Sequence, residues 1–344
     1  MRKDEPDKRS RTKSKTLRYK LLMVFTLLVV VAWSVAWFAA ATVVDRQAEK
    51  LEHQAVARGF VGDCVNRSVT GFPFRIEIRC DRGSRVGNGV AVATIEALTA
   101  AALVYNPRRA IVELGGPVTV SANGFDDLTA DWSLARASAR ITLTTGLTRF
   151  DAEVEDASVV VGDRAPATVG KLAVNARQNP ATPAALDVAV RLDGLRPTEG
   201  AMPARLAFNG TLSDGAPLLS GAARPVLAAL LTDGLTLDLR GASFESGPMS
   251  VAASGMLTLT PAGLFNGTID VALAGYDEGL PYIDAVAPEA EATVVSVLAN
   301  ILAFAPETTI GDRAAKKLTL TVSDGRVRAG FVPLFTIPRV ALVR

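Results

Sequence analysis

Residues 21–44 form a strongly apolar stretch of 24 positions without a charged side chain. At about 1.5 Å per residue, a helix of this length reaches roughly 36 Å, enough to cross a hydrocarbon core about 30 Å thick. A cleaved signal peptide is the alternative, since residues 39–41 are the small residues that a signal peptidase accepts. The run is longer than the roughly 7 to 15 apolar residues of a signal peptide, so it favours an uncleaved signal-anchor helix.

The spacing of apolar positions changes after this run. Over residues 45–60, Leu51, Ala55 and Val56 fall on one face of a helix, which predicts a short helical stalk. From residue 61 onward apolar and polar residues alternate, which is typical of strands with one apolar and one polar face. The clearest examples are residues 75–78, 235–240, 256–260, 267–273 and 317–322.

Turn chemistry supports antiparallel pairing. Asn-Gly and Asp-Gly dipeptides supply the positive φ angles of tight hairpins, and eight occur, beginning at Asn88, Asn123, Asp193, Asn209, Asp214, Asp233, Asn266 and Asp324. Those at Asn209 and Asn266 lie in a repeated tetrapeptide that we interpret as a hairpin turn. Residues 61–344 are therefore predicted to be mainly β, a large antiparallel meander with a possible sub-boundary near residues 195–205.

Two stretches with helical spacing interrupt the strands, at residues 225–232 and 289–304. The second has a candidate apolar face made of Val294, Val297, Leu298, Ile301 and Leu302. A helix this apolar needs cover, so we expect one or two short helices to pack on the concave face of a curved sheet. That face either closes into an ordinary core or stays open as a groove for an acyl chain.

Charge sets the expected topology. Residues 1–20 carry nine basic and three acidic side chains, and such basic flanks stay on the cytoplasmic side of a membrane. Residues 1–20 are thus expected to be a cytoplasmic tail, and the chain from residue 45 onward to lie outside. The 28 basic and 32 acidic residues after position 44 leave that part mildly acidic, without the basic patch of a nucleic-acid-binding protein.

Both cysteines, Cys64 and Cys80, fall on the exported side, where disulfides form readily. Their midpoint lies in a plausible turn, so we predict a disulfide that staples a hairpin, with two free buried thiols as the alternative. Two registers are open: one sets the cysteines opposite each other, and a one-residue slip pairs Val65 with Ile78. A bulge would reconcile the two. A metal site is not expected, because the cysteines are 16 positions apart and the single histidine, His53, precedes them.

The predicted turn between the cysteines consists of Gly71, Phe72, Pro73, Phe74 and Arg75. We expect its aromatic rings to pin the first hairpin to the sheet. A binding role for Phe72 and Arg75 is the alternative.

Catalytic signatures are missing. A nucleophilic triad needs a base, yet His53 lies outside the predicted β domain, and no nucleophile elbow, phosphate-binding loop or zinc-binding spacing occurs. The adjacent acids Asp126 and Asp127 follow Gly124 and are interpreted as a solvated loop. No catalytic residue, cofactor or metal is predicted.

Four stretches carry a resemblance to a known family: residues 71–75, residues 104–109 leading into 113–117, residues 244–249 followed by 254–257, and residues 324–338. They resemble an uncharacterised family of single-span bacterial envelope proteins, the domain-of-unknown-function family 2125. The resemblance implies a single-pass inner-membrane protein with a periplasmic β domain and supplies no chemistry. The plan of an anchor followed by amphipathic strands is also similar to periplasmic proteins of the AsmA type, which are implicated in moving phospholipid.

Two functions follow from these observations. The first is an inner-membrane-anchored periplasmic protein with a binding or scaffold role, contacting phospholipid or another envelope protein and no nucleic acid. The second is an envelope hydrolase that uses carboxylates or a serine without histidine.

Overall fold

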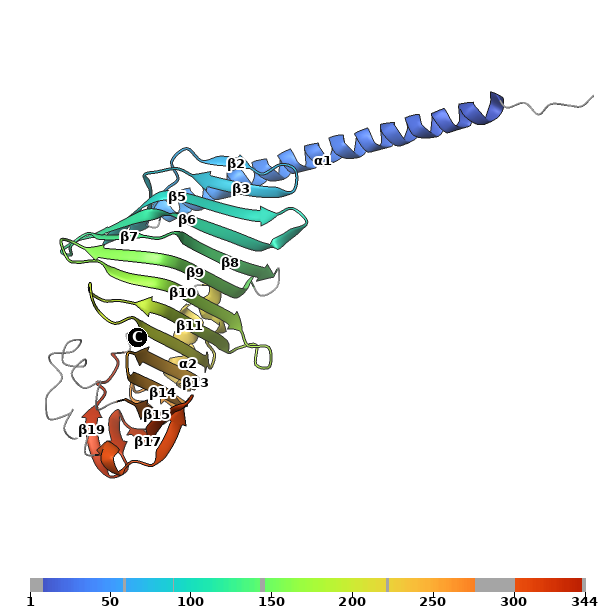
Figure 1. Cartoon of the computed structure of the whole chain (residues 1–344). Helices are drawn as coiled ribbons and strands as arrows, with labels where there is room; N and C mark the ends of the chain where they lie inside the picture. Colours follow the sequence, from blue (N-terminus) through green and yellow to red (C-terminus); the bar gives the residue numbers. More distant parts are fainter. Residues whose placement is uncertain are drawn as a thin grey trace, which may run out of the picture.

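The computed structural model describes residues 9–57, 60–88, 90–142, 146–220, 223–275 and 301–341. Helix α1 (Arg9–Ala57) projects far beyond the sheet at its N-terminal end and packs beside the first strands at its C-terminal end (Figure 1). The predicted anchor and stalk are one continuous helix, because no proline or glycine interrupts residues 21–57. Within Leu17–Gln54, α1 contains a stretch that is apolar and long enough to span a membrane.

All paired strands are antiparallel and belong to one sheet. The strands are β1 (Phe60–Asp63), β2 (Ser68–Thr70), β3 (Arg75–Cys80), β4 (Ser84–Asn88), β5 (Ala91–Leu103), β6 (Asn106–Ala122), β7 (Leu128–Asp131), β8 (Leu134–Thr142), β9 (Gly146–Val161), β10 (Ala167–Gln178), β11 (Leu186–Leu195), β12 (Ala204–Leu212), β13 (Leu235–Ser246), β14 (Met249–Leu259), β15 (Phe265–Ala274), β16 (Glu307–Ile310), β17 (Arg313–Ser323), β18 (Arg326–Ala329) and β19 (Val332–Thr336). Between β12 and β13 lie the 3₁₀-helix η1 (Ala216–Ser220) and helix α2 (Ala223–Thr232).

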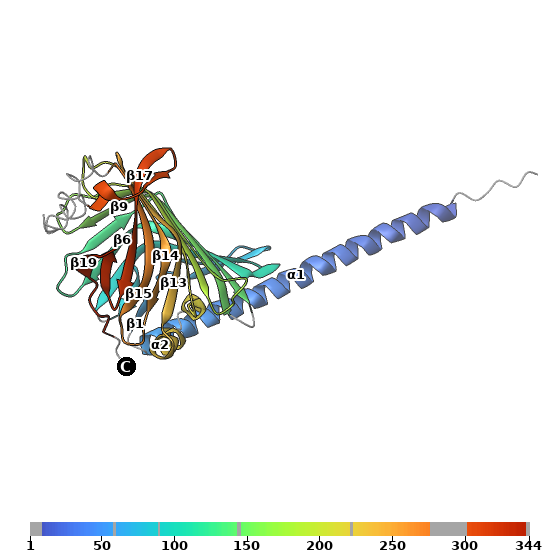
Figure 2. The same ribbon diagram turned by 90° about the horizontal axis from the view of Figure 1, so that it is seen from below.

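The main path of pairing follows the chain closely, in the order β2-β3-β5-β6-β8-β9-β10-β11-β12-β13-β14-β15-β17-β18-β19. Short strand β4 pairs with β5 and with β1, β7 pairs with both β6 and β9, and β16 pairs with β17. Seen along the stack, the strand direction turns steadily from the first strands to the last (Figure 2). The predicted fold class, a large antiparallel meander after an apolar helix, is confirmed.

The sheet continues through the proposed sub-boundary near residues 195–205, because β11 and β12 pair along their whole length. The predicted short helix at residues 225–232 is confirmed as α2. The interpretation of Asn209 and Asn266 as turn residues is wrong, since both lie inside strands. The glycine after Asn266 serves a different purpose: a Cβ on Gly267 would come within 2.1 Å of the Met256 carbonyl oxygen, so glycine permits close approach of β14.

Candidate functional site

One face of the sheet is apolar across the twelve strands of the main pairing path from β3 to β17. Directly opposed residues form a ladder on this face: Ile78, Ala100, Val112, Ala137, Ala152, Val174, Val190, Phe208, Ala242, Ala253, Val271 and Leu318. A second apolar ladder runs beside it: Cys80, Leu98, Leu114, Ala135, Val154, Leu172, Leu192, Leu206, Phe244, Val251 and Leu273. We call the side bearing these two ladders the apolar face.

The opposite side of the same strands is mostly polar. Shifting the first ladder by one residue gives Arg79, Thr99, Glu113, Arg136, Glu153, Ala173, Arg191, Ala207, Ser243, Ala252, Ala272 and Lys317. Ion pairs cross this side, for example Lys171 with Glu155 at 3.0 Å. The alternation in the sequence therefore appears as two chemically distinct faces.

The apolar face is only partly covered in the described part of the chain. Strands β8, β9 and β10 contain no buried residue along their described length. Side chains such as Val154, Val174 and Val190 keep an intermediate exposure, as expected for an apolar sheet face without a second layer. Eleven steps of about 4.8 Å give the face a length of roughly 53 Å.

Cover is found at two places. In the described part of the chain, η1 packs against β9 and β10, and α2 packs against η1. At β17, Leu302 is 1% exposed and forms a small core with Ala305 and Leu318.

The candidate helical face at residues 289–304 is only partly described. Leu302 lies in the small core, and Ile301 packs against it. Ile301 also lines an open hollow of about 850 Å³. Val294, Val297 and Leu298 lie outside the described residues.

The anchor helix and the first hairpin are joined by two tryptophan side chains. Trp33 Nε1 donates a hydrogen bond to the Pro73 carbonyl oxygen at 3.0 Å, and Trp37 Nε1 donates one to the Arg75 carbonyl oxygen at 2.9 Å. The Phe72 ring lies 5.5 Å from that of Trp37, centroid to centroid. Phe72 therefore pins the hairpin to α1, whereas we expected it to pin the hairpin to the sheet.

Two other residues of the turn, Phe74 and Arg75, are exposed. Phe74 is 63% exposed, and the Arg75 guanidinium pairs with Glu77 at 2.9 Å. Glu77 is itself buried between Arg75 and Arg79, with which it also forms an ion pair. The positive charges of the two arginines compensate its burial.

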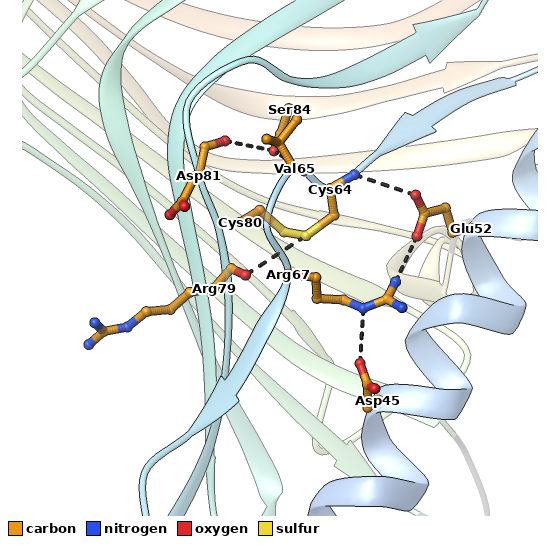
Figure 3. Close-up of a disulfide and its surroundings, with 9 residues drawn as sticks. All are labelled: Asp45, Glu52, Cys64, Val65, Arg67, Arg79, Cys80, Asp81 and Ser84. Atoms are coloured by element: carbon orange, nitrogen blue, oxygen red, sulfur yellow. Dashed lines mark hydrogen bonds and ion pairs between the residues drawn. A yellow bond between two sulfur atoms is a disulfide. The ribbon is translucent and has the colours of Figure 1, made fainter.

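Cys64 and Cys80 form a disulfide with their Cα atoms 5.1 Å apart (Figure 3). Both predicted registers are wrong, because β2 pairs with β3 with Ser68 opposite Arg79. Residues 64–67, between β1 and β2, are not part of a strand, and Asn66 has a φ of 48°. This segment contacts α1.

Arg67 ties this segment to the helix. Its Nε donates to Asp45 Oδ1 at 2.9 Å and its Nη1 donates to Glu52 Oε2 at 2.7 Å (Figure 3). Asp45 and Glu52 are two helical turns apart and so share one face of α1. That acidic spacing was visible in the sequence, but its basic partner follows only from the fold.

Asp187 has several polar partners on the polar side of the sheet. It accepts hydrogen bonds from Thr211 and Asn179, both at 2.8 Å, and pairs with Arg177 at 3.2 Å. Burial alone would raise the pKa of Asp187, but these hydrogen bonds and the charge of Arg240 outweigh it and hold the pKa below its ordinary value. The cluster borders a polar hollow of about 270 Å³.

The remaining titratable candidates do not converge. His53 is exposed on α1, 4.0 Å from Glu49. Asp126 and Asp127 lie in the exposed turn after β6, as expected for a solvated loop. Within the described ranges, no group of three or more histidine, cysteine or acidic side chains could hold a metal ion.

Comparison with known proteins identifies a family. The model of a family described as uncharacterised protein conserved in bacteria (DUF2125) matches residues 37–338. No curated protein and no solved structure matched the chain, and the AsmA-type likeness rests on architecture alone. The family match begins at Trp37 and covers the tryptophan contact to β3, the disulfide and the entire apolar face. Because this match covers most of the chain, the protein belongs to the DUF2125 family of uncharacterised bacterial proteins.

Proposed function

We propose that this protein is anchored in the bacterial inner membrane by α1 and holds lipid acyl chains against the apolar face of its periplasmic sheet, without catalysing a reaction. The observation that carries the proposal is the pair of apolar ladders, which continue from β3 to β17 while β8 to β10 stay without a buried residue in their described length. Soluble proteins rarely expose continuous apolar patches beyond a few hundred Å².

The size of the face supports a lipid occupant. Two ladders about 7 Å apart, each with side chains several Å across, and roughly 53 Å long give an apolar strip of about 700 Å². The strip is about three times as long as the roughly 15 Å thickness of hydrocarbon in one leaflet. It can therefore hold one acyl chain, or several placed end to end.

The energetics favour exchange with a membrane. An acyl chain that leaves water gains about 0.8 kcal/mol per methylene. A chain that moves from a bilayer to the apolar face exchanges one apolar surrounding for another, so its net free energy of transfer is close to zero. Such a site would hold lipid loosely and release it readily, which suits a protein that handles lipid beside a membrane.

A photocrosslinking amino acid placed on either side of the same strands tests the proposal. The full chain is expressed in bacteria with the photoreactive residue at Val174 or Val190 of the apolar face. Matched controls carry it at the adjacent positions Asn175 and Arg191, which lie on the polar side and are more exposed. After irradiation, mass spectrometry of the intact protein measures phospholipid adducts.

We expect adducts at Val174 and Val190 and none at Asn175 and Arg191. If access to solvent alone governed labelling, the controls would react more. Equal labelling on both sides, or no phospholipid at positions 174 and 190, would contradict acyl-chain binding on this face.

A further inference from the structure

The position of the first hairpin along the anchor helix places it at the depth of the membrane. Trp33 and Trp37, which bind the turn at residues 71–75, lie inside the uncharged run of residues 21–44. From Leu21, a rise of about 1.5 Å per residue puts Trp33 at roughly 18 Å and Trp37 at roughly 24 Å. Both values fall short of the approximately 30 Å needed to cross the hydrocarbon core.

The helix cannot simply slide outward to lift the turn from the bilayer. A shift of about 12 Å would draw roughly eight further residues into the hydrocarbon. Those residues, 13–20, include Lys13, Lys15, Arg18 and Lys20. Burying several cations in hydrocarbon is strongly unfavourable, so the turn stays about 6 to 12 Å below the outer boundary of the core.

Exposed aromatic side chains, which are suited to contact with lipid, lie on the surface of this region. Phe74 is 63% exposed, and Tyr105, at the turn between β5 and β6, is 70% exposed. The two turns are neighbours, because the Val104 amide donates to the Phe74 carbonyl oxygen at 3.0 Å. The turn at residues 71–75 lies beside α1, and both turns point toward the side on which the N-terminal part of α1 extends (Figure 1).

Basic side chains border the aromatic ones. Arg108 and Arg109 follow Tyr105 on β6 and are exposed, as is Arg75. Long arginine side chains can place their charge at the phosphate level while their stems stay in the apolar region. Aromatic rings flanked by such cations are typical of protein surfaces at a membrane interface.

We infer that the turns at residues 71–75 and 104–106 form a second membrane contact, which inserts into the outer leaflet of the bilayer that α1 crosses. Phe72 packs on the anchor, whereas Phe74 and Tyr105 contact lipid. This inference rests on the proposed anchoring by α1 and does not depend on acyl-chain binding along the sheet.

Fluorescence quenching at single labelled cysteines tests the inference. Phe74→Cys and Tyr105→Cys replace exposed side chains and carry an environment-sensitive NBD label. Cys64 and Cys80 do not react under non-reducing conditions, because they form a disulfide. The full chain is reconstituted in phospholipid vesicles that contain lipids with a nitroxide on the acyl chain.

Two control positions separate the possible failures. Phe125→Cys replaces an aromatic residue that is 78% exposed at the far end of β6, which is 17 residues long and so about 55 Å in extent. Val29→Cys reports whether α1 is inserted at all.

We expect blue-shifted emission and strong quenching at positions 74, 105 and 29, and neither at 125. Quenching at 29 with labels at 74 and 105 behaving like 125 would overturn the second contact and leave the anchor intact. Absence of quenching at 29 as well would overturn both the anchor and the second contact.

Discussion

The hydrogen bond from Trp37 to β3 gives the sharpest test of how the sheet is held on its anchor. Trp37→Phe keeps an aromatic ring against Phe72 but removes the donor to the Arg75 carbonyl oxygen. Because Trp37 is only 4% exposed, the carbonyl loses its partner in a place that water hardly reaches, at a cost of about 1–3 kcal/mol. At about 1.4 kcal/mol per tenfold change, local opening of the hairpin becomes roughly 5- to 150-fold more frequent.

Hydrogen exchange of the full chain in phospholipid nanodiscs measures this opening. Peptides that cover β2 and β3 should exchange faster in Trp37→Phe, while those from β13 and β14 should not change. Trp132→Phe is the matched control, since Trp132 Nε1 donates a similar hydrogen bond to the Leu114 carbonyl oxygen at 2.8 Å. Its effect should be confined to β6 and its neighbours.

Unchanged exchange of residues 68–80 in Trp37→Phe would refute a specific attachment of the hairpin. So would an acceleration of equal size in every strand, because that would indicate global destabilisation.

Three further outcomes are expected. Replacing Cys64 and Cys80 together by serine should lower the free energy of unfolding by about 3 kcal/mol in the chain-entropy model. The melting temperature of the wild type should fall when reductant is added, whereas that of the variant should not change. Identical melting of the wild type with and without reductant would reject the disulfide. The stabilising contribution of Asp187 should be complete above its unfolded pKa, near 3.9, and be lost as the pH falls through its lower folded pKa. The difference in melting temperature between wild type and Asp187→Asn should therefore shrink below about pH 4. Asp193→Asn on the same strand is the control, and a difference independent of pH would contradict the prediction. Gly267→Ala should strongly lower the melting temperature, because its Cβ would meet the Met256 carbonyl oxygen at 2.1 Å. Gly241→Ala, whose Cβ would have no atom within 4 Å, should have little effect. Equal effects of the two substitutions would show that close approach of β14 is not what position 267 requires.

The sequence predicted those elements whose signal is local. Alternation over residues 235–240 and 317–322 depends only on which side of a strand each residue faces, so β13 and β17 could be predicted without their partners. The apolar run of α1 and the composition of α2 are equally local. These signals are enough for fold class.

Register and tertiary contacts required the partners. The hairpin register differs from both predicted alternatives because Cys64 and Arg67 turn aside to bind Glu52 of α1, a contact that spacing between cysteines does not encode. Asn266 looked like a turn residue because Asn-Gly favours hairpins. Inside β15 the following glycine is needed instead for the approach of the neighbouring strand.

The orientation of the sheet relative to α1 determines where a bound acyl chain would lie. Strand β3 runs outward along the helix: its first residue, Arg75, is bonded to Trp37, and its last, Cys80, is joined through Cys64 to the region of Glu52. Ile78, the start of the first apolar ladder, is three residues or about 10 Å beyond Arg75. In the proposed membrane placement, Arg75 lies about 6 Å below the outer boundary of the hydrocarbon, and the ladder then begins near the headgroups.

From that level, the apolar face leads along the membrane. A ladder crosses its strands, and Figure 1 shows the strands stacked in a direction that crosses the axis of α1. If α1 spans the bilayer, the roughly 53 Å of apolar face extend beside the membrane surface, not away from it across the envelope. An acyl chain leaving the outer leaflet would thus meet the ladder at Ile78 and be kept from water close to its own membrane. This geometry favours local handling of lipid over transfer to a distant membrane.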